Sequence, residues 1–213
     1  MRDGRRGALD LGVGETTVLL GASGQGKTAW IRSLLGFDAP FDQVRAFGRP
    51  LTPAAVPELL SWVPERDGVF LSETVWQNCT SKAHGLGRVD PELVVDALDL
   101  VGLADRAGEP VAHLGTGGRR RVALARALAR RRPLLVVDGP LDPTLWVFWR
   151  SITERMSWLQ GIVIAASVAD EVARQAETVA LVDQGAVIGQ APLAMLEGSL
   201  DPQVRSVLAW VTP

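Results

Sequence analysis

Short apolar runs alternate along the chain with segments in which apolar residues recur every three or four positions. Thr17–Leu20 is a run of β-favouring residues that ends at Gly21, and the sequence AWIRSLLG just after Lys27 has helical spacing and stops at Gly36. This order predicts a strand, then a glycine-rich turn, then a helix.

The same alternation continues through the rest of the chain. Continuous apolar runs at 134–137 and 162–165 are bounded by Pro, Asp and Gly, which is typical of strands buried on both faces of a parallel sheet. Helical spacing covers 91–101 and 122–132, and glycines bracket a hairpin-like stretch at 185–189. The pattern therefore predicts a layered α/β core.

Composition narrows the class of protein. The 213 residues, 47% hydrophobic and 22% charged, suffice for one globular domain and exclude a disordered tail or a charge-rich nucleic-acid arm. The 22 Lys and Arg against 24 Asp and Glu leave a net charge of −2, so no overall positive field draws the chain to nucleic acid or anionic lipid. Cys79, the only cysteine, excludes an intrachain disulfide and a cysteine zinc site and favours a reducing compartment.

The sequence also bears on membranes. Its apolar runs are far shorter than the roughly 18 to 20 residues that cross a bilayer. The beginning, MRDGRRGALDLGVG, has arginines with no apolar stretch behind them, so we expect no signal peptide.

The strongest chemical signal lies between the first predicted strand and helix. Residues 21–28 read GASGQGKT and match G-x-x-x-x-G-K-[ST], in which a glycine-rich loop wraps its N–H groups round phosphates at a helix N-terminus. The lysine would reach the β- and γ-phosphates, and the threonine hydroxyl would hold Mg²⁺. The alternative is a glycine turn that only caps a helix. The expected nucleotide contacts are Gly21, Ala22, Ser23, Gly24, Gln25, Gly26, Lys27 and Thr28.

Four further stretches, in order and spacing, are similar to a known family. Residues 114–128, LGTGGRRRVALARAL, resemble its signature segment LSGGQRQRVALARAL, and residues 134–140, LLVVDGP, resemble its Walker B strand LLLLDEP. The WVPE at 62–65, followed by VFLSETVWQN, resembles the Q-loop, and residues 161–190 resemble the final strand, the H-loop and the terminal hairpin. Over nearly its whole length the chain therefore resembles the ATP-binding cassette (ABC) subunits of membrane transporters.

The resemblance implies a fold and an organisation. The expected fold is that of a P-loop NTPase (RecA-like), a mainly parallel sheet flanked by helices, with a small helical subdomain and a reduced N-terminal antiparallel β part. We expect one ABC-type domain over residues 1–213, with 1–68 and 114–213 as the nucleotide-binding core and 69–113 as the helical subdomain. The resemblance also implies a cytoplasmic location, peripheral at the inner face of the cell membrane.

The resemblance implies ligands and partners as well. The cofactors would be ATP and Mg²⁺, with Thr28, Asp138 and Glu65 as the metal ligands. Two cassettes would close head to tail on ATP, in a homodimer or a heterodimer, with Gly117 contacting the partner's nucleotide at a helix N-terminus. That closure would drive a transmembrane transporter subunit. Neither nucleic acid nor zinc is an expected partner.

Each residue that acts on the attacking water departs from the family's pattern. Gly139 stands where the carboxylate after the Walker B aspartate polarises water, and glycine cannot act as a base. Ser167 aligns with the H-loop histidine, and Glu65 aligns with the Q-loop glutamine. No catalytic position is therefore intact.

Other segments of the pattern are altered too. The signature reads LGTGG at 114–118, with a β-branched residue where backbone approaches phosphate, and the D-loop SALD aligns with DPTL at 142–145. No aromatic residue precedes Gly21, although the family stacks adenine on one in an N-terminal strand. Either that strand is lost or the chain begins after it.

These observations favour a pseudo-ATPase, a transporter subunit that binds MgATP with little or no hydrolysis and has a structural or regulatory role. One alternative is an active ABC ATPase with non-standard catalytic residues, in which Asp142 or Glu65 acts as the base. A second is a nucleotide-independent interaction scaffold. The sequence leaves the transported substrate and the direction of transport open.

The remaining features have ordinary explanations. The arginines at 130–132 suit a helix C-terminus, and those at 119–121 lie where the family also carries arginine, so neither cluster indicates a nucleic-acid patch. His84 and His113 lack partners at metal spacing. We expect Cys79 to be buried and Trp30 and Trp210 to be core or packing residues. For two aromatic segments we weigh partner contact against core packing: Val69, Phe70, Leu71 and Trp76 after the Q-loop, and Trp146, Phe148 and Trp149 after the D-loop.

Overall fold

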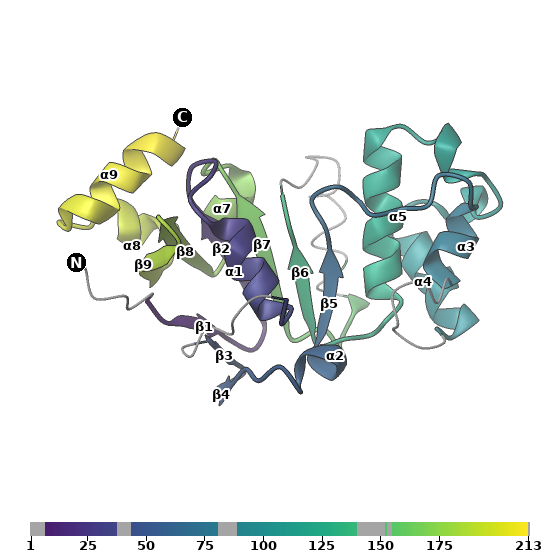
Figure 1. Ribbon diagram of the computed structural model, residues 1–213, viewed down its shortest axis with the longest axis horizontal. Helices are drawn as coiled ribbons and strands as arrows, with labels where there is room; N and C mark the ends of the chain where they lie inside the picture. The colour runs from purple at the N-terminus through teal and green to yellow at the C-terminus, as the bar shows by residue number, and fades with distance from the viewer. Residues whose placement is uncertain (1–6, 38–43, 81–88, 140–151, 153–154, 213) are drawn as a thin grey trace. The chain divides into compact units, whose positions relative to one another are not determined.

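The computed structural model describes residues 7–37, 44–80, 89–139, 152 and 155–212 (Figure 1). The chain divides into two compact units. The first contains Met1–Leu60, Val136–Pro140 and Gln160–Pro213, and the second contains Ser61–Leu135 and Leu141–Leu159. Each unit is described separately below.

The main sheet of the first unit is mostly parallel. Strand β2 pairs in parallel with β7 on one side and with β8 on the other, and β9 is antiparallel to β8. Among the strands that contribute residues to this unit's sheet, leaving aside β5, the order is β6, β7, β2, β8, β9. Nearly all residues of β2, β6 and β7 are buried, as expected for strands covered on both faces. The strands are β2 (Glu15–Leu20), β6 (Leu134–Val137), whose first two residues belong to the second unit, β7 (Gly161–Ala166), β8 (Thr178–Asp183) and β9 (Ala186–Ala191).

A second, three-stranded sheet contains β1 (Leu9–Leu11), β3 (Val44–Ala46) and β4 (Arg49–Pro50). Strands β3 and β4 are antiparallel because a two-residue turn with both φ angles positive, Phe47 at 55° and Gly48 at 75°, joins them. Strand β1 runs parallel to β3, because the long stretch of chain between them forms a crossover. This N-terminal β part therefore contains antiparallel pairing, as predicted, between β3 and β4, and β1 adds a parallel pairing.

The helices of the first unit are short, and α7 and α9 begin at aspartate caps. Asp170 accepts hydrogen bonds from the N–H groups of Val172 and Ala173, and Asp201 caps the last helix in the same way. The first helix ends just before Gly36, whose φ is 75°. The helices are α1 (Lys27–Leu34), α2 (Val56–Leu59), α7 (Glu171–Gln175), α8 (Leu193–Glu197) and α9 (Pro202–Val211).

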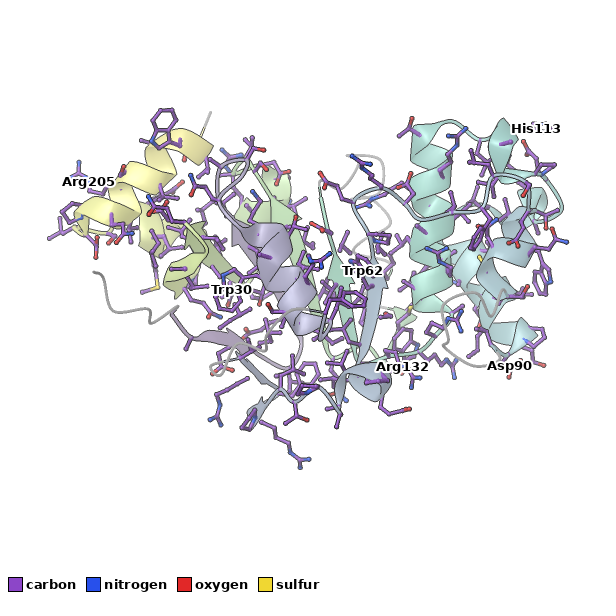
Figure 2. The ribbon with its side chains drawn as sticks, viewed as in Figure 1. Trp30, Trp62, Asp90, His113, Arg132 and Arg205 are labelled. Atoms are coloured by element: carbon purple, nitrogen blue, oxygen red, sulfur yellow. The ribbon has the colours of Figure 1, made fainter. Side chains whose placement is uncertain are left out.

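The two tryptophans expected in the core of this unit behave differently. Trp30, on α1, is fully buried, which confirms the prediction (Figure 2). Trp210 is 78% exposed, so the prediction for it was wrong. Helix α9 already fills its buried face with aliphatic residues, and Trp210 falls outside that stripe; the buried residues are Val204, Val207, Leu208 and Val211.

The second unit is built on helices that pack against one another (Figure 1). Cys79, on α3, is fully buried among them, as predicted. Helix α5 begins six residues before the predicted start at 122 and ends at Leu128, short of the predicted end at 132. The elements are β5 (Leu60–Val63), whose first residue belongs to the first unit, α3 (Val75–Thr80), α4 (Pro91–Leu100), the 3₁₀ turns Ala104–Arg106 and Val111–His113, and α5 (Thr116–Leu128).

Across the ranges that the structure describes, no helix combines the length and the apolar character that crossing a bilayer requires.

Candidate phosphate-binding site

Residues 21–28, the phosphate loop, connect β2 to α1 in the first unit. Gly24 and Gly26 have φ angles of 80° and 96°, a left-handed conformation that favours glycine. Gly21 is required for a different reason, because a Cβ there would lie 2.3 Å from the carbonyl oxygen of Val182. The glycines of the motif thus give this loop its path beside the backbone of β8.

Lys27 is the first residue of α1 and is only 9% exposed. Its Nζ donates hydrogen bonds to the carbonyl oxygens of Gly21, at 2.5 Å, and Ala22, at 2.9 Å. Gly26 occupies the N-cap position and has no side chain that could cap the helix. A cation held by the loop and a helix N-terminus capped only by glycine together form the usual site for a phosphate group.

Thr28 and Asp138 meet beside this loop. The Thr28 hydroxyl donates to Oδ1 of Asp138 at 3.3 Å, and Asp138, just after β6, is only 4% exposed. A hydroxyl and a buried carboxylate are the hard oxygen ligands that Mg²⁺ prefers, and the ion usually takes its remaining ligands from water and phosphate. The two residues therefore fit a magnesium ion, although no group of three or more His, Cys, Asp or Glu suited to a metal occurs within the described ranges.

Gly139 and Ser167 lie in the same unit, each just after a strand of the main sheet. Gly139 has a φ of 83°. Ser167 is exposed and follows Ala166, whose carbonyl oxygen accepts a hydrogen bond from the Gly21 N–H at 3.3 Å. The first unit thus brings together the phosphate loop, Asp138, Gly139 and Ser167.

Glu65 and Gly117 belong to the second unit. Glu65 is exposed in the loop after β5. Gly117 lies in the first turn of α5, after the N-cap Gly115. Their expected contacts, Glu65 with Mg²⁺ and Gly117 with a partner's nucleotide, stay predictions. The D-loop at 142–145, together with Trp146, Phe148, Trp149 and His84, lies outside the described residues.

Comparison with known proteins assigns the family. The model of the ABC transporter family matches residues 6–142, which is more than half of the chain. The chain belongs to the ABC transporter family.

Several members resemble it over most of its length. It is 32% identical to the aliphatic sulfonates import ATP-binding protein SsuB 1 of Pseudomonas fluorescens, over 88% of this chain and 70% of that one. It is 31% identical to the Fe(3+) ions import ATP-binding protein FbpC of the same organism, over 94% of this chain and 60% of that one. A putative ABC transporter ATP-binding protein of Halobacterium salinarum is 37% identical, over 70% of this chain and 67% of its own length.

Solved structures agree on the fold. The chain aligns with cbiO1 of Clostridium perfringens, part of the ABC transporter complex cbiONQ, with a TM-score of 0.70 at 22% identity, over 91% of this chain and 87% of that one. An ATP-binding subunit of an ABC transporter aligns with a TM-score of 0.73 at 20% identity, over 93% and 90% of the two chains. These matches confirm the P-loop NTPase fold predicted from the sequence.

In the second unit of this ABC protein, the predicted Q-loop continues into a loop whose arginine contacts sequence reasoning did not predict. Residues 64–68, the clamped loop, follow β5 and are held by arginines of α5. The Arg126 guanidinium donates to the carbonyl oxygens of Gly68 at 2.7 Å and Asp67 at 3.1 Å. The Arg120 guanidinium donates to the carbonyl oxygen of Pro64 and lies 3.7 Å from Oδ1 of Asp67. Both arginines are 7% exposed.

Burial shifts the protonation of these groups. Desolvation raises the pKa of the Asp67 carboxyl, against the opposing attraction of Arg120, and lowers the pKa of the Arg126 guanidinium. Burial also raises the pKa of the Cys79 thiol to about 12, so this thiol stays protonated at neutral pH. The sequence did contain one signal for these contacts to the clamped loop: Arg126 is a charged residue between Ala125 and Ala127 in a predicted helix. A guanidinium that is buried at such a position needs oxygen atoms as hydrogen-bond partners.

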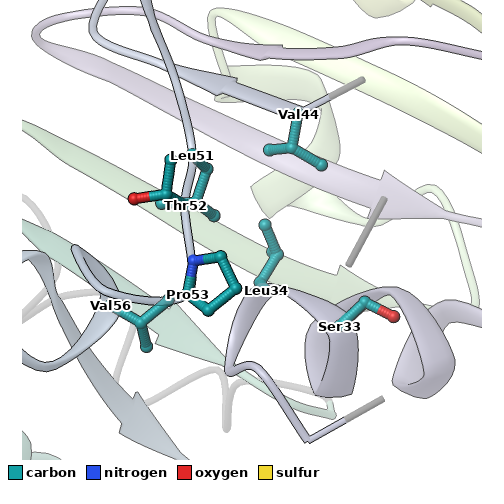
Figure 3. Close-up of a pocket in the computed structure, with 7 residues that line it drawn as sticks. All are labelled: Ser33, Leu34, Val44, Leu51, Thr52, Pro53 and Val56. Carbon is teal, nitrogen blue, oxygen red and sulfur yellow. The ribbon is translucent and has the colours of Figure 1, made fainter. Parts of the chain in front are cut away.

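A small cavity in the first unit has no room for a nucleotide. Its volume is about 10 Å³, which is room for one water molecule at most. Figure 3 shows its mainly apolar lining, formed by Ser33, Leu34, Val44, Leu51, Thr52, Pro53 and Val56. We conclude that this cavity is a packing defect and not a ligand site.

Proposed function

We propose that this chain is the nucleotide-binding subunit of an ABC-type membrane transporter and that it binds MgATP with little or no hydrolysis. One observation carries the proposal. The phosphate loop and two of the expected metal ligands, Thr28 and Asp138, lie in one unit, where the Thr28 hydroxyl donates a hydrogen bond to Asp138 at 3.3 Å, while the neighbouring position 139 has no side chain.

Phosphate binding follows from the loop and the helix end. Lys27 already has its ammonium group beside the loop carbonyls, and a short movement of this flexible side chain would bring the charge to a β- or γ-phosphate. The N–H groups of the loop and of the first turn of α1 would take the phosphate oxygens. Mg²⁺, when bound by Thr28 and Asp138, would neutralise phosphate charge.

Hydrolysis lacks its usual base. A positioned general base contributes about 10² to 10⁴ in rate, and Gly139 supplies no such group. The Ser167 hydroxyl can donate a hydrogen bond, but it is not an imidazole that changes its charge near neutral pH. We therefore expect tight binding and slow turnover from this chain's own site, and a structural or regulatory use of the bound nucleotide.

The proposal extends to partners and place. The relatives are named as ATP-binding proteins of import systems, which supports a transmembrane transporter subunit as one partner and a location at the cytoplasmic face of the membrane. Phe70 and Leu71, 37% and 46% exposed just after the clamped loop, provide an apolar contact for that subunit. Gly117, near an N-terminus capped only by glycine, would contact the nucleotide of a second cassette.

Binding and turnover need separate measurements. Titration calorimetry with MgATP on the full chain should show binding, and a steady-state phosphate assay should show release at least about 100-fold below that of a competent cassette. Lys27→Ala should weaken binding about 100-fold or more, since it removes the charge-assisted contact with the phosphates. Lys82→Ala, at the only other lysine, is the matched control and should bind normally.

Each outcome supports or overturns the proposal. Binding without release supports it. Binding with fast release that Lys27→Ala blocks would establish an active ATPase with unfamiliar catalytic residues. An absence of binding by the wild-type chain would leave an interaction scaffold.

A further inference from the structure

The turn between β8 and β9 presents two N–H groups on residues that both have left-handed backbones. Gln184 has a φ of 47° and Gly185 has a φ of 76°, so the two residues form the tight turn that joins the antiparallel strands. In such a turn the N–H groups of the two central residues are not used by the strand ladder and need other partners.

One residue of the phosphate loop accepts both of these hydrogen bonds. The Gly185 N–H donates to the backbone carbonyl oxygen of Gln25 at 2.8 Å, and the Gln184 N–H donates to the side-chain Oε1 of Gln25, also at 2.8 Å. The two segments also touch directly, because a Cβ on Gly26 would lie 2.8 Å from the Cα of Gly185. The hairpin turn thus supports the phosphate loop at one point.

This support fixes the direction of a phosphate donor. In a planar trans peptide, the carbonyl of residue 25 and the N–H of residue 26 point in opposite directions. Because the Gln25 carbonyl is held toward the turn, the Gly26 N–H is directed away from the turn and stays available to a ligand. An N–H that is oriented in advance binds phosphate without first paying the entropy of ordering the loop.

We propose that Gln25 is a positioning residue, which fastens the phosphate loop to the turn at 184–185 and thereby holds the Gly26 N–H ready for phosphate. The proposal rests on the nucleotide site proposed above and goes beyond it, since the motif accepts any residue at this position. Any residue at position 25 could accept the hydrogen bond from the Gly185 N–H through its backbone carbonyl oxygen. The bond to Gln184 needs a side chain with an acceptor at the length of glutamine.

The test compares variants that differ in this acceptor. Gln25→Met keeps the length and shape of the side chain and loses the acceptor, and Gln175→Met, at an exposed position on α7, is the matched control. Calorimetry on the full chain measures Kd for MgATP and for magnesium pyrophosphate. Gln25→Met should raise both Kd values about threefold to tenfold, the usual effect of losing one hydrogen bond, and Gln175→Met should raise neither.

Two further measurements separate positioning from a merely structural role. The unfolding midpoint of the nucleotide-free protein reports stability alone, and amide hydrogen exchange by NMR should show that Gln25→Met exposes the Gln184 N–H selectively. Gln184→Gly, which retains that N–H, should bind MgATP within about twofold of the wild type. If Gln25→Met does not fold, Gln25→Asn, one methylene shorter, takes its place and should also raise both Kd values.

The outcomes are distinguishable. If the Gln25 variant binds both ligands as tightly as the wild type, or loses stability with unchanged Kd values, this inference is overturned and the proposed function stands. If the wild-type chain itself binds no MgATP, the proposed function fails first.

Discussion

The phosphate loop and the clamped loop both need their backbone conformation to be held in place, and the two loops are held by different groups. Each follows a strand, and each includes residues with positive φ, namely Gly24 and Gly26 in the first and Asp67 and Gly68 in the second. The phosphate loop is shaped by glycine and supported by neutral oxygens of its own Gln25. The clamped loop is held by guanidinium groups from α5.

The difference lies in which groups remain for a ligand. Arginines occupy the carbonyl oxygens of the clamped loop at Pro64, Asp67 and Gly68, so its backbone conformation is stabilised from within the protein. In the phosphate loop the cation belongs to the loop itself, and Lys27 can leave its carbonyl partners for a phosphate. We infer that removing the charged side chain of the first loop acts mainly on binding, that removing the charged side chains that hold the second acts on stability, and that the glycines of both loops act on stability through the backbone.

The largest expected effect is on stability, at Arg126. Arg126→Met removes the charge-assisted bonds from a buried guanidinium to two part-buried carbonyls and should lower the free energy of unfolding by about 3 kcal/mol in urea denaturation. Arg126→Lys should recover part of the loss, because an ammonium cannot match the two-pronged guanidinium. Arg66→Met, at an exposed position in the same loop, is the control and should change stability by less than about 0.5 kcal/mol.

Measuring the stability of a phosphate-loop variant tests whether the two loops differ in this way. Lys27→Ala should weaken MgATP binding about 100-fold or more and should lower the free energy of unfolding by about 1 to 2 kcal/mol, less than Arg126→Met, since the ammonium bonds one buried and one part-buried carbonyl oxygen of its own loop. If Lys27→Ala destabilised the chain as much as Arg126→Met, the two loops would not differ in the way proposed.

The next effect compares one glycine from each loop. An alanine at Gly26 would place its Cβ 2.8 Å from the backbone of Gly185, whereas at Gly68 the nearest atom is Cγ of Pro64, at 3.2 Å. Both positions also carry the cost of a left-handed residue, roughly 1 to 2 kcal/mol. Gly26→Ala should therefore destabilise by about 2 kcal/mol or more, and Gly68→Ala by about 1 kcal/mol, in urea denaturation.

These contacts show which features a sequence reveals. Strand β6 spans 134–137, as its apolar run predicted, because a strand buried on both faces needs only local hydrophobicity. The start of α5 at Thr116 was missed, because the Gly117-Gly118 pair disfavours a helix on local propensity and packing of the whole helix overrides it. Local pattern therefore predicts the buried strands better than it predicts helix ends.

The supports of the site are harder to predict, because they join distant segments. Arg126 lies 58 positions from Gly68, and Gln25 lies 159 positions from Gln184. The phosphate loop motif specifies glycines and a lysine but leaves position 25 open, so nothing local marks that residue as a support. The exposure of Trp210 was also not predictable from local hydrophobicity, since aliphatic residues of α9 fill the face of the helix that is buried.

The smallest effect is on pH dependence and concerns Asp67. Burial raises the pKa of this carboxyl in the folded state, so its charged form opposes folding at neutral pH. The sign follows from linkage: the stabilising contribution is fully present below the unfolded pKa and is lost as the pH rises through the higher folded pKa. Asp67→Asn keeps an oxygen for Arg120 and removes the titration.

Relative to Asp67→Asn, the wild-type chain should therefore gain stability as the pH falls from 7 into the acid range. The gain is small, because Arg120 attracts the charged form and the group is partly solvated. Urea denaturation of both proteins at several pH values measures the difference between their unfolding free energies. A difference that changed in the opposite direction would mean that the Arg120 ion pair outweighs burial, and the clamped loop would then be held by charge pairing as well as by hydrogen bonds to its backbone.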